Sequence, residues 1–141
     1  MDKICKKCAA DPTSHSYKKV TEKNGVSIYY SHPATAKLYD DMDGIIEHVD
    51  RIMSTNGSKK WICIFNGEGF GVKHTMEFTM GVKLAELLTN KYGDTLQEMK
   101  IINPTWYITY ALKIVHATVK PSIVEKIKVL DDRRYSVLEF I

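Results

Sequence analysis

The sequence lacks the features of a membrane-spanning or exported chain. Its 141 residues contain no apolar run of about 18 residues, the length that a bilayer-crossing helix needs. The opening MDKICKKCAADP is charged and has no signal-peptide core. With 44% hydrophobic and 26% charged residues, the composition is that of a globular domain with a core. We therefore expect a cytoplasmic protein that associates with membranes only transiently.

Cysteine is scarce, and its spacing is incomplete for a metal site. Cys5 and Cys8 form one CxxC, and no second CxxC follows. A structural zinc site needs four ligands; His15 could supply a third, but a fourth is not evident. The sequence therefore favours two reduced surface thiols on a loose arm and predicts no metal site. Cys63 lies within an apolar run and is expected to be a buried structural thiol.

Catalytic and nucleotide-binding motifs are also missing. The chain has no GxSxG, no HExxH and no pair of histidines four residues apart. Gly67, Gly69 and Gly71 invite a phosphate-loop interpretation, but Val72-Lys73-His74 completes neither the dinucleotide fingerprint nor the P-loop. We expect these glycines to serve a turn and close packing, and we expect no enzyme activity, no cofactor and no nucleic-acid partner.

The net charge of +3 is concentrated at the N-terminus. Six lysines and three acidic residues lie within residues 1–23, and the rest of the chain is neutral. A solvated, flexible segment is the favoured interpretation; docking on anionic lipid is the alternative. We divide the chain into a basic N-terminal arm, residues 1–24, and a single domain, residues 25–141.

Strand-like and helix-like segments alternate along that domain. Apolar runs with β-branched and aromatic residues predict strands, helical spacing predicts amphipathic helices, and crossovers of this length predict parallel pairing. The expected fold class is α/β, with a mixed, largely parallel sheet flanked by helices. The expected strands are 26–30, 61–65, 99–103 and 126–130, the expected helices are 40–54, 75–91, 105–119 and a short one from Pro121, and 137–141 is left as helix or edge strand.

The segment 105–119 stands out because it is apolar almost all round. A surface helix should have one polar side. Two interpretations remain open: a buried core helix, which the segment alone favours, or a helix that lines a cavity for an apolar ligand and moves to admit it.

Four short pieces resemble the CRAL-TRIO domain, the lipid-binding module of cellular retinaldehyde-binding, tocopherol-transfer and phosphatidylinositol-transfer proteins. The resemblance runs from about Val26 to Leu130. Its pieces are WICIFNGEGFGVKH (61–74), with Asn66 where an aspartate is usual, YGD (92–94) where the family often has Tyr-Pro-Glu, IINPTW (101–106), and the lysine-proline to lysine-isoleucine segment 120–127.

The resemblance implies a lipid pocket with the sheet as its floor and the helix from Trp106 as part of a mobile gate. It implies a phospholipid, a phosphoinositide or another hydrophobic small molecule as ligand, and lipid transfer or sensing at a membrane surface as function. Lys126, and more loosely Asp94, occupy the headgroup positions of phosphoinositide-binding members. The pocket and gate residues are then Trp106, Tyr107, Tyr110, Ile114, Phe65 and Phe78.

The chain also departs from the family pattern. The usual N-terminal helical subdomain and the Leu-Pro-x-x-Tyr-Gly-Gly ending are not in this sequence, so we expect a minimal form whose pocket is small, open or completed by a second copy. The segment 103–109 also resembles the BCH branch of the family. That resemblance implies the alternative function, a protein-interaction scaffold for small GTPases or their regulators.

Overall fold

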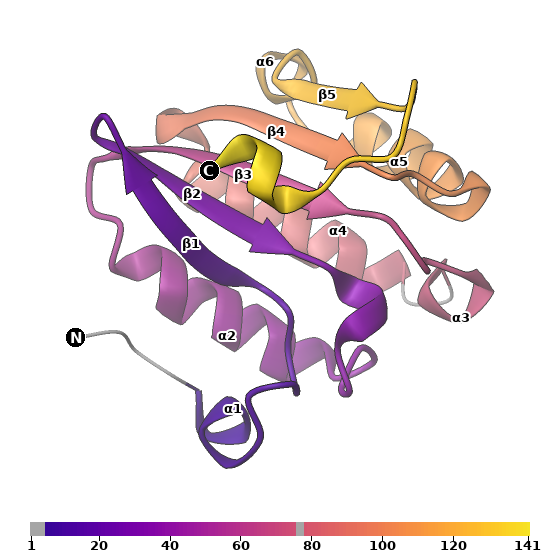
Figure 1. Cartoon of the computed structure of the whole chain (residues 1–141), viewed down its shortest axis with the longest axis horizontal. Helices are drawn as coiled ribbons and strands as arrows, with labels where there is room; N and C mark the ends of the chain where they lie inside the picture. The colour runs from indigo at the N-terminus through magenta and orange to yellow at the C-terminus, as the bar shows by residue number, and fades with distance from the viewer. Residues whose placement is uncertain (1–4, 76–77) are drawn as a thin grey trace.

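A computed structural model describes residues 5–75 and 78–141; for residues 74, 75 and 78–80 it describes the backbone alone. Five strands form one sheet in the order β1-β2-β3-β4-β5, in which β1 is antiparallel to β2 and the other neighbours are parallel (Figure 1). This confirms the predicted α/β class. The strands are β1 (Lys18–Lys23), β2 (Val26–Ser31), β3 (Lys60–Asn66), β4 (Leu96–Ile102) and β5 (Ile127–Leu130).

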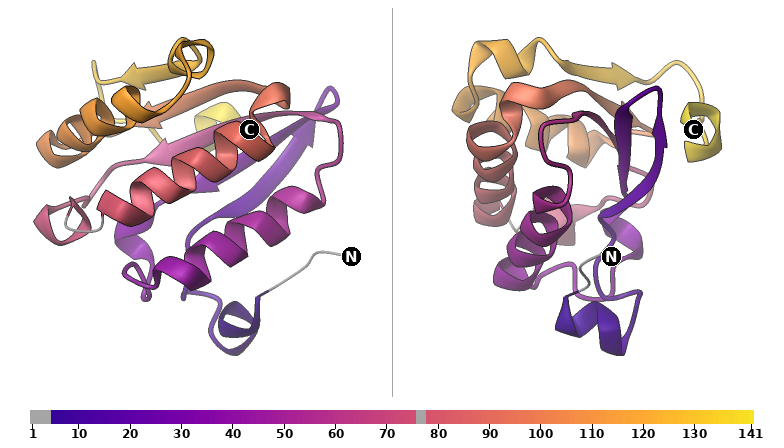
Figure 2. Two further views of the ribbon diagram at one scale, coloured as in Figure 1. Left: turned by 180° about the vertical axis from the view of Figure 1, so that it is seen from behind. Right: turned by 90° about the vertical axis from the view of Figure 1, so that its left-hand side faces the viewer.

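The three long helices cover one face of this sheet. Each crossover leads to the next strand in the same direction, and right-handed crossovers of this kind place their helices on a common face. Figure 2 shows α2, α4 and α5 side by side on that face. The helices are α1 (Lys6–Ala10), α2 (Met42–Ser54), α3 (Val72–Thr75), α4 (Phe78–Glu86) with its π-helical continuation η2 (Leu87–Lys91), α5 (Trp106–Thr118) and α6 (Pro121–Val124), and the 3₁₀ turns are η1 (Pro33–Thr35), η3 (Gly93–Thr95) and η4 (Val137–Phe140).

Strand β3 is the centre of the sheet and is buried on both faces, as its continuous apolar run predicts. Trp61 and Cys63 point into the core beneath the helices, and Ile64 points to the opposite side. The smaller core on that opposite side packs against Tyr135, Val137 and Phe140 of the C-terminal segment, which the right-hand view of Figure 2 shows across the sheet from the helices. For residues 137–141 the sequence left helix and edge strand open; in the structure Val137–Phe140 form a 3₁₀ turn that covers the sheet.

The glycine loop after β3 serves close packing and a turn, as expected. A Cβ on Gly67 would lie 3.1 Å from the Asn103 carbonyl oxygen and 3.2 Å from Pro104 Cα, so any larger residue would have to push the segment after β4 away by a few tenths of an ångström. Gly69 has a φ of +80°, which glycine adopts without strain.

The N-terminal segment is more ordered than the sequence indicates. Residues 18–23 form the edge strand β1, and Lys6–Ala10 form the short helix α1. The prediction of surface thiols is wrong, because Cys5 and Cys8 are both buried. The sequence missed β1 because its KKVTEK run has little apolar content, which suits an edge strand that must resist pairing with other chains. The boundary between arm and domain stays a prediction.

Candidate functional site

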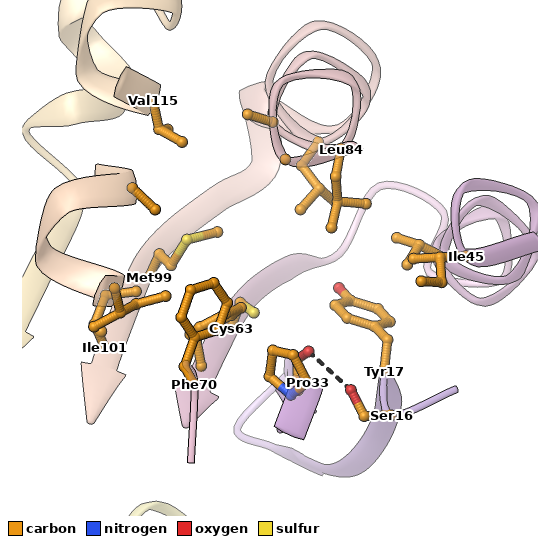
Figure 3. A pocket seen from close by; sticks show the side chains of 18 of the residues that line it. Ser16, Tyr17, Pro33, Ile45, Cys63, Phe70, Leu84, Met99, Ile101 and Val115 are labelled. Carbon is orange, nitrogen blue, oxygen red and sulfur yellow. Dashed lines mark hydrogen bonds between the residues drawn. The ribbon is translucent and has the colours of Figure 1, made fainter. Parts of the chain in front are cut away.

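An apolar cavity of about 220 Å³ lies between the helices and the sheet. Figure 3 shows Val115 of α5, Leu84 of α4, Ile45 of α2 and Cys63 of β3 around this common space. The cavity has a floor of sheet residues and a roof of helix residues. The floor residues include Cys63, Phe65, Met99, Ile101 and Ile127, and the roof residues include Ile45, Val49, Leu84, Leu88, Ile108, Leu112, Ile114 and Val115.

Four polar side chains of the cavity wall, Tyr17, Cys63, Ser16 and Ser31, are uncharged at neutral pH. Burial raises the pKa of the Tyr17 phenol well above its usual value, and its hydroxyl donates to Met53 Sδ at 3.0 Å. Burial raises the pKa of the Cys63 thiol to about 12. The Ser16 and Ser31 hydroxyls lie 3.2 Å apart and bond to each other (Figure 3). Such a wall suits an aliphatic ligand. None of these four side chains is ionised, so filling the cavity does not strip water from a charge.

Helix α5 lines the cavity with one side and presents aromatic rings to solvent with the other. Ile108, Leu112 and Val115 follow the helical spacing and line the cavity. On the outer side Trp106 is 72% exposed and Tyr110 48% exposed, and their rings stack with centroids 6.1 Å apart. The doubly apolar sequence of this helix therefore corresponds to a cavity on one side and an exposed aromatic surface on the other.

Hydrogen bonds of Thr105 anchor the start of the helix. The Thr105 hydroxyl donates to the Phe70 carbonyl at 2.7 Å and accepts from the Ile108 N–H, so it caps α5 and ties it to the glycine loop. The main packing partners of α5 are the helices α4 and α3. Only Ile108 is fully buried among its thirteen residues. Few fully buried side chains therefore hold α5 against the rest of the fold.

The predicted pocket and gate residues occupy different places. Phe65 and Ile114 line the cavity. Trp106 and Tyr110 lie on the exposed side of α5, and half-buried Tyr107 meets Trp106 edge to face at 4.9 Å. Phe78 begins α4, and its side chain lies outside the described part of the structure.

The two predicted headgroup residues do not line the cavity. Asp94 is exposed in η3, just before β4, and Lys126 is half-buried just before β5. Because β4 and β5 are parallel, both residues lie at the amino-terminal edge of the sheet. The Lys126 carbonyl accepts from the Met99 N–H at 2.9 Å, which holds its backbone in place.

Sequence reasoning missed much of the cavity wall and one notable side chain. Ile45 and Val49 of α2 lie on its apolar stripe, and Met99 and Ile101 alternate along β4, so periodicity assigned them to a core. Which part of a core stays hollow depends on packing between elements. His48, also on α2, lies beside Cys8 and His15, although the sequence separates them by 40 and 33 residues.

A family model, CRAL/TRIO domain, matches residues 13–141, most of the chain. The chain belongs to the CRAL-TRIO family. Members of this family generally bind or transfer lipids and other hydrophobic small molecules rather than catalyse reactions.

The comparison with solved structures supports the same fold. The chain is similar in structure to the protein Sfh5, whose crystal structure superposes on it with a TM-score of 0.69 and 11% sequence identity. The match covers 88% of this chain and 49% of the other, so this CRAL-TRIO chain spans about half the length of that protein. A comparison with curated proteins finds no match. In the described ranges, none of the helices combines the length and apolar character that crossing a bilayer requires.

Proposed function

We propose that this CRAL-TRIO chain binds the apolar part of a lipid in the cavity beneath α5 and exchanges it at membrane surfaces. The observation that carries the proposal is the two-sided helix: its inner side lines an apolar cavity, and its outer side exposes Trp106 and Tyr110. Tryptophan and tyrosine are the side chains that favour the membrane–water interface.

The size of the cavity supports a gate role for α5. At about 220 Å³ it is smaller than the roughly 300–1,000 Å³ of pockets that hold drug-sized ligands. A lipid therefore has to widen it, and α5 has few buried residues to displace. Each methylene transferred from water into the cavity contributes about 0.8 kcal/mol, so a single acyl chain offsets a modest rearrangement.

The ligand we favour is a phospholipid or phosphoinositide, with Lys126 and Asp94 near its headgroup. Lysine is a compact, mobile positive charge suited to a phosphate. If Lys126 has this role, Lys126→Ala should weaken binding to phosphoinositide vesicles while binding to neutral phospholipid is retained. The matched control is Lys128→Ala, because Lys128 is exposed and lies in β5, two residues after Lys126. Equal phosphoinositide binding by the parent chain and Lys126→Ala would contradict the headgroup assignment.

The first experiment is lipid extraction from the purified chain followed by mass spectrometry, with fluorescent-lipid transfer between vesicles as the functional assay. Leu112→Asp places a charge in the cavity wall and should abolish lipid retention, whereas Tyr110→Asp on the outer side should retain lipid but transfer it more slowly. Thr109→Asp, an exposed neighbour, is the control for charge on α5. Lipid retention by a folded Leu112→Asp chain would contradict the cavity assignment.

The alternative function, a BCH-like scaffold for small GTPases or their regulators, predicts a different outcome. A chain that carries no lipid and takes up none from vesicles would favour it. The exposed Trp106–Tyr110 surface would then be the first place to look for a protein partner.

A further inference from the structure

Four metal-ligating side chains from distant parts of the chain meet next to the cavity. They are Cys5 and Cys8 at the start of α1, His15 before β1, and His48 on α2, called here the Cys2His2 cluster. All four are buried, with exposed fractions of 5%, 8%, 6% and 6%. Each residue offers a ligand atom, and these atoms all lie within 4.8 Å of one another.

Three sulfur–nitrogen distances inside the cluster match the edges of a tetrahedral zinc site. His15 Nδ1 lies 3.5 Å from Cys5 Sγ and 3.6 Å from Cys8 Sγ, and His48 Nδ1 lies 3.6 Å from Cys8 Sγ. Zn–S bonds of about 2.3 Å and Zn–N bonds of about 2.0–2.1 Å place sulfur and nitrogen about 3.5–3.6 Å apart on the edges of a tetrahedron.

The surroundings orient both imidazoles for metal binding. His15 Nε2 lies 3.1 Å from the Asp41 carboxylate, and His48 Nε2 lies 2.6 Å from the Tyr17 carbonyl oxygen. Both oxygens can only accept, so in the neutral rings each Nε2 carries the hydrogen and each Nδ1 presents its lone pair to the cluster. Outer partners of this kind typically fix the ligating histidines of zinc proteins.

One of the two sulfur atoms, that of Cys5, receives a hydrogen bond that favours its thiolate form. The Cys8 backbone N–H points at Cys5 Sγ, 3.3 Å away, and supports a negative sulfur. Two thiolates and two neutral imidazoles around Zn²⁺ carry no net charge, which makes the buried site tolerable in energy. The charge of Asp41 is balanced separately by Lys7, whose Nζ lies 2.6 Å away.

We propose that the Cys2His2 cluster binds one Zn²⁺ as a structural site. The thiolate and imidazole ligands suit zinc, and four protein ligands leave no open position for a substrate. Because three ligands come from the N-terminal segment and the fourth from α2, the ion would tie these two parts of the chain together. Since His15 and His48 also line the cavity, this link would lie at the cavity wall. This inference is independent of the lipid proposal, since it rests on different side chains and predicts metal content instead of lipid binding.

The test is to purify the full chain under reducing conditions and to measure its metal content by inductively coupled plasma mass spectrometry. We expect one zinc per chain. Replacement by Co²⁺ should produce the strong visible bands of tetrahedral cobalt and a near-ultraviolet thiolate-to-cobalt band. Cys8→Ser and His48→Gln should lose the stoichiometric zinc and these bands.

Matched controls separate the cluster from adventitious binding. Cys63→Ala and His116→Gln change a cysteine and a histidine outside the cluster and should keep one zinc per chain. Asp41→Asn should weaken zinc binding by about ten- to a hundredfold, the effect typical of losing an outer partner of a ligating histidine.

A second measurement needs no variant. In the unchanged chain, zinc should protect Cys5 and Cys8 from alkylation, and a strong chelator should expose both to the reagent. The proposal is overturned if the reduced chain takes up no stoichiometric zinc. It is equally overturned if folded Cys8→Ser and His48→Gln hold zinc as tightly as the parent chain, or if Cys5 and Cys8 form a disulfide that persists in the presence of zinc and reductant.

Discussion

Asn103 joins the end of β4 to the C-terminal segment through its side-chain amide. Its Oδ1 accepts from the Tyr135 N–H at 2.7 Å and its Nδ2 donates to the Tyr135 carbonyl at 2.8 Å. Its φ is +51°, a left-handed conformation that asparagine tolerates better than most residues. This one residue therefore turns the chain toward α5 and holds the segment that covers the far side of the sheet.

Two substitutions at Asn103 separate these roles. Asn103→Gly keeps the left-handed backbone but loses the two hydrogen bonds to Tyr135 and the one that Nδ2 donates to Asn66 Oδ1 at 3.2 Å. We expect it to lower the free energy of unfolding by about 1–3 kcal/mol. Asn103→Ala should lose about 1 kcal/mol more, because the added Cβ disfavours a positive φ. Urea denaturation of the three chains measures both differences, and equal stability of Asn103→Gly and the parent would show that the hydrogen bonds contribute nothing.

Asp50 introduces a pH dependence into the packing of α2 against η2. Its carboxylate accepts a short hydrogen bond from the Tyr92 hydroxyl and lies 2.9 Å from Lys91 Nζ. The Tyr92 hydrogen bond and then the Lys91 partner lower the pKa of Asp50. A lowered pKa in the folded state means that the unfolded chain binds the proton more readily, so Asp50 stabilises the fold above its unfolded pKa of about 3.9.

We expect Asp50→Asn to cost no more than about 1 kcal/mol at pH 7, because the side chain is partly exposed. The loss should shrink as the pH falls below about 4 and the parent carboxylate takes up its proton. Denaturation curves at pH 7 and pH 3 measure the change. Tyr92→Phe, which keeps the ring and removes the donor, should reproduce part of it, and a loss that is the same at both pH values would contradict the assignment.

At the scale of elements, α5 and α2 have the same length but different burial. Both contain thirteen residues, and α2 buries His48, Val49 and Met53 whereas α5 buries only Ile108. Local opening costs less where fewer apolar groups are buried. We therefore expect α5 to be the less protected of the two helices in the ligand-free chain.

Hydrogen exchange followed by mass spectrometry tests this difference. The amides of α5 should exchange at least about tenfold faster than those of α2, which corresponds to about 1.4 kcal/mol in opening free energy. Loading with lipid should slow exchange in α5 and leave α2 nearly unchanged. Slowing of equal size in both helices would indicate general stabilisation and count against α5 as the gate.

At the scale of the molecule, the Cys2His2 cluster links the N-terminal segment to the helix layer. A ligand that binds only the folded state adds RT ln(1 + [L]/Kd) to stability, or about 4.1 kcal/mol at a free concentration of 1,000 Kd. Zinc removal by a chelator should therefore lower the thermal midpoint of the parent chain. The midpoint of Cys8→Ser should not respond to the chelator, and an unresponsive parent chain would argue against a structural ion.

The family model and the fold agree on a CRAL-TRIO domain, and local sequence was enough to predict most of its elements. The helix around Ile45 and Val49 shows the helical period, because burying one face of a helix demands it, and the continuous apolar run 61–65 fits a strand that is buried on both faces. Pro121 opens α6 because proline suits the first turn of a helix, and Pro104 stands directly before Thr105, the N-cap of α5. The almost wholly apolar sequence of α5 left a buried core helix and a cavity-lining helix open, and in the structure one side of α5 lines the cavity while the other side is exposed.

Tertiary structure alone decided the features that depend on contacts between distant residues. The polar strand β1 is a strand because β2 offers it an edge, and its own residues carry no period that would predict this. Which side of α5 faces the cavity follows from its packing on α4. The sequence by itself determined the order and type of most elements, since local periodicity encodes them. Only folding brought His48 to Cys5, Cys8 and His15, because a spatial cluster leaves no local pattern when its members lie on separate elements.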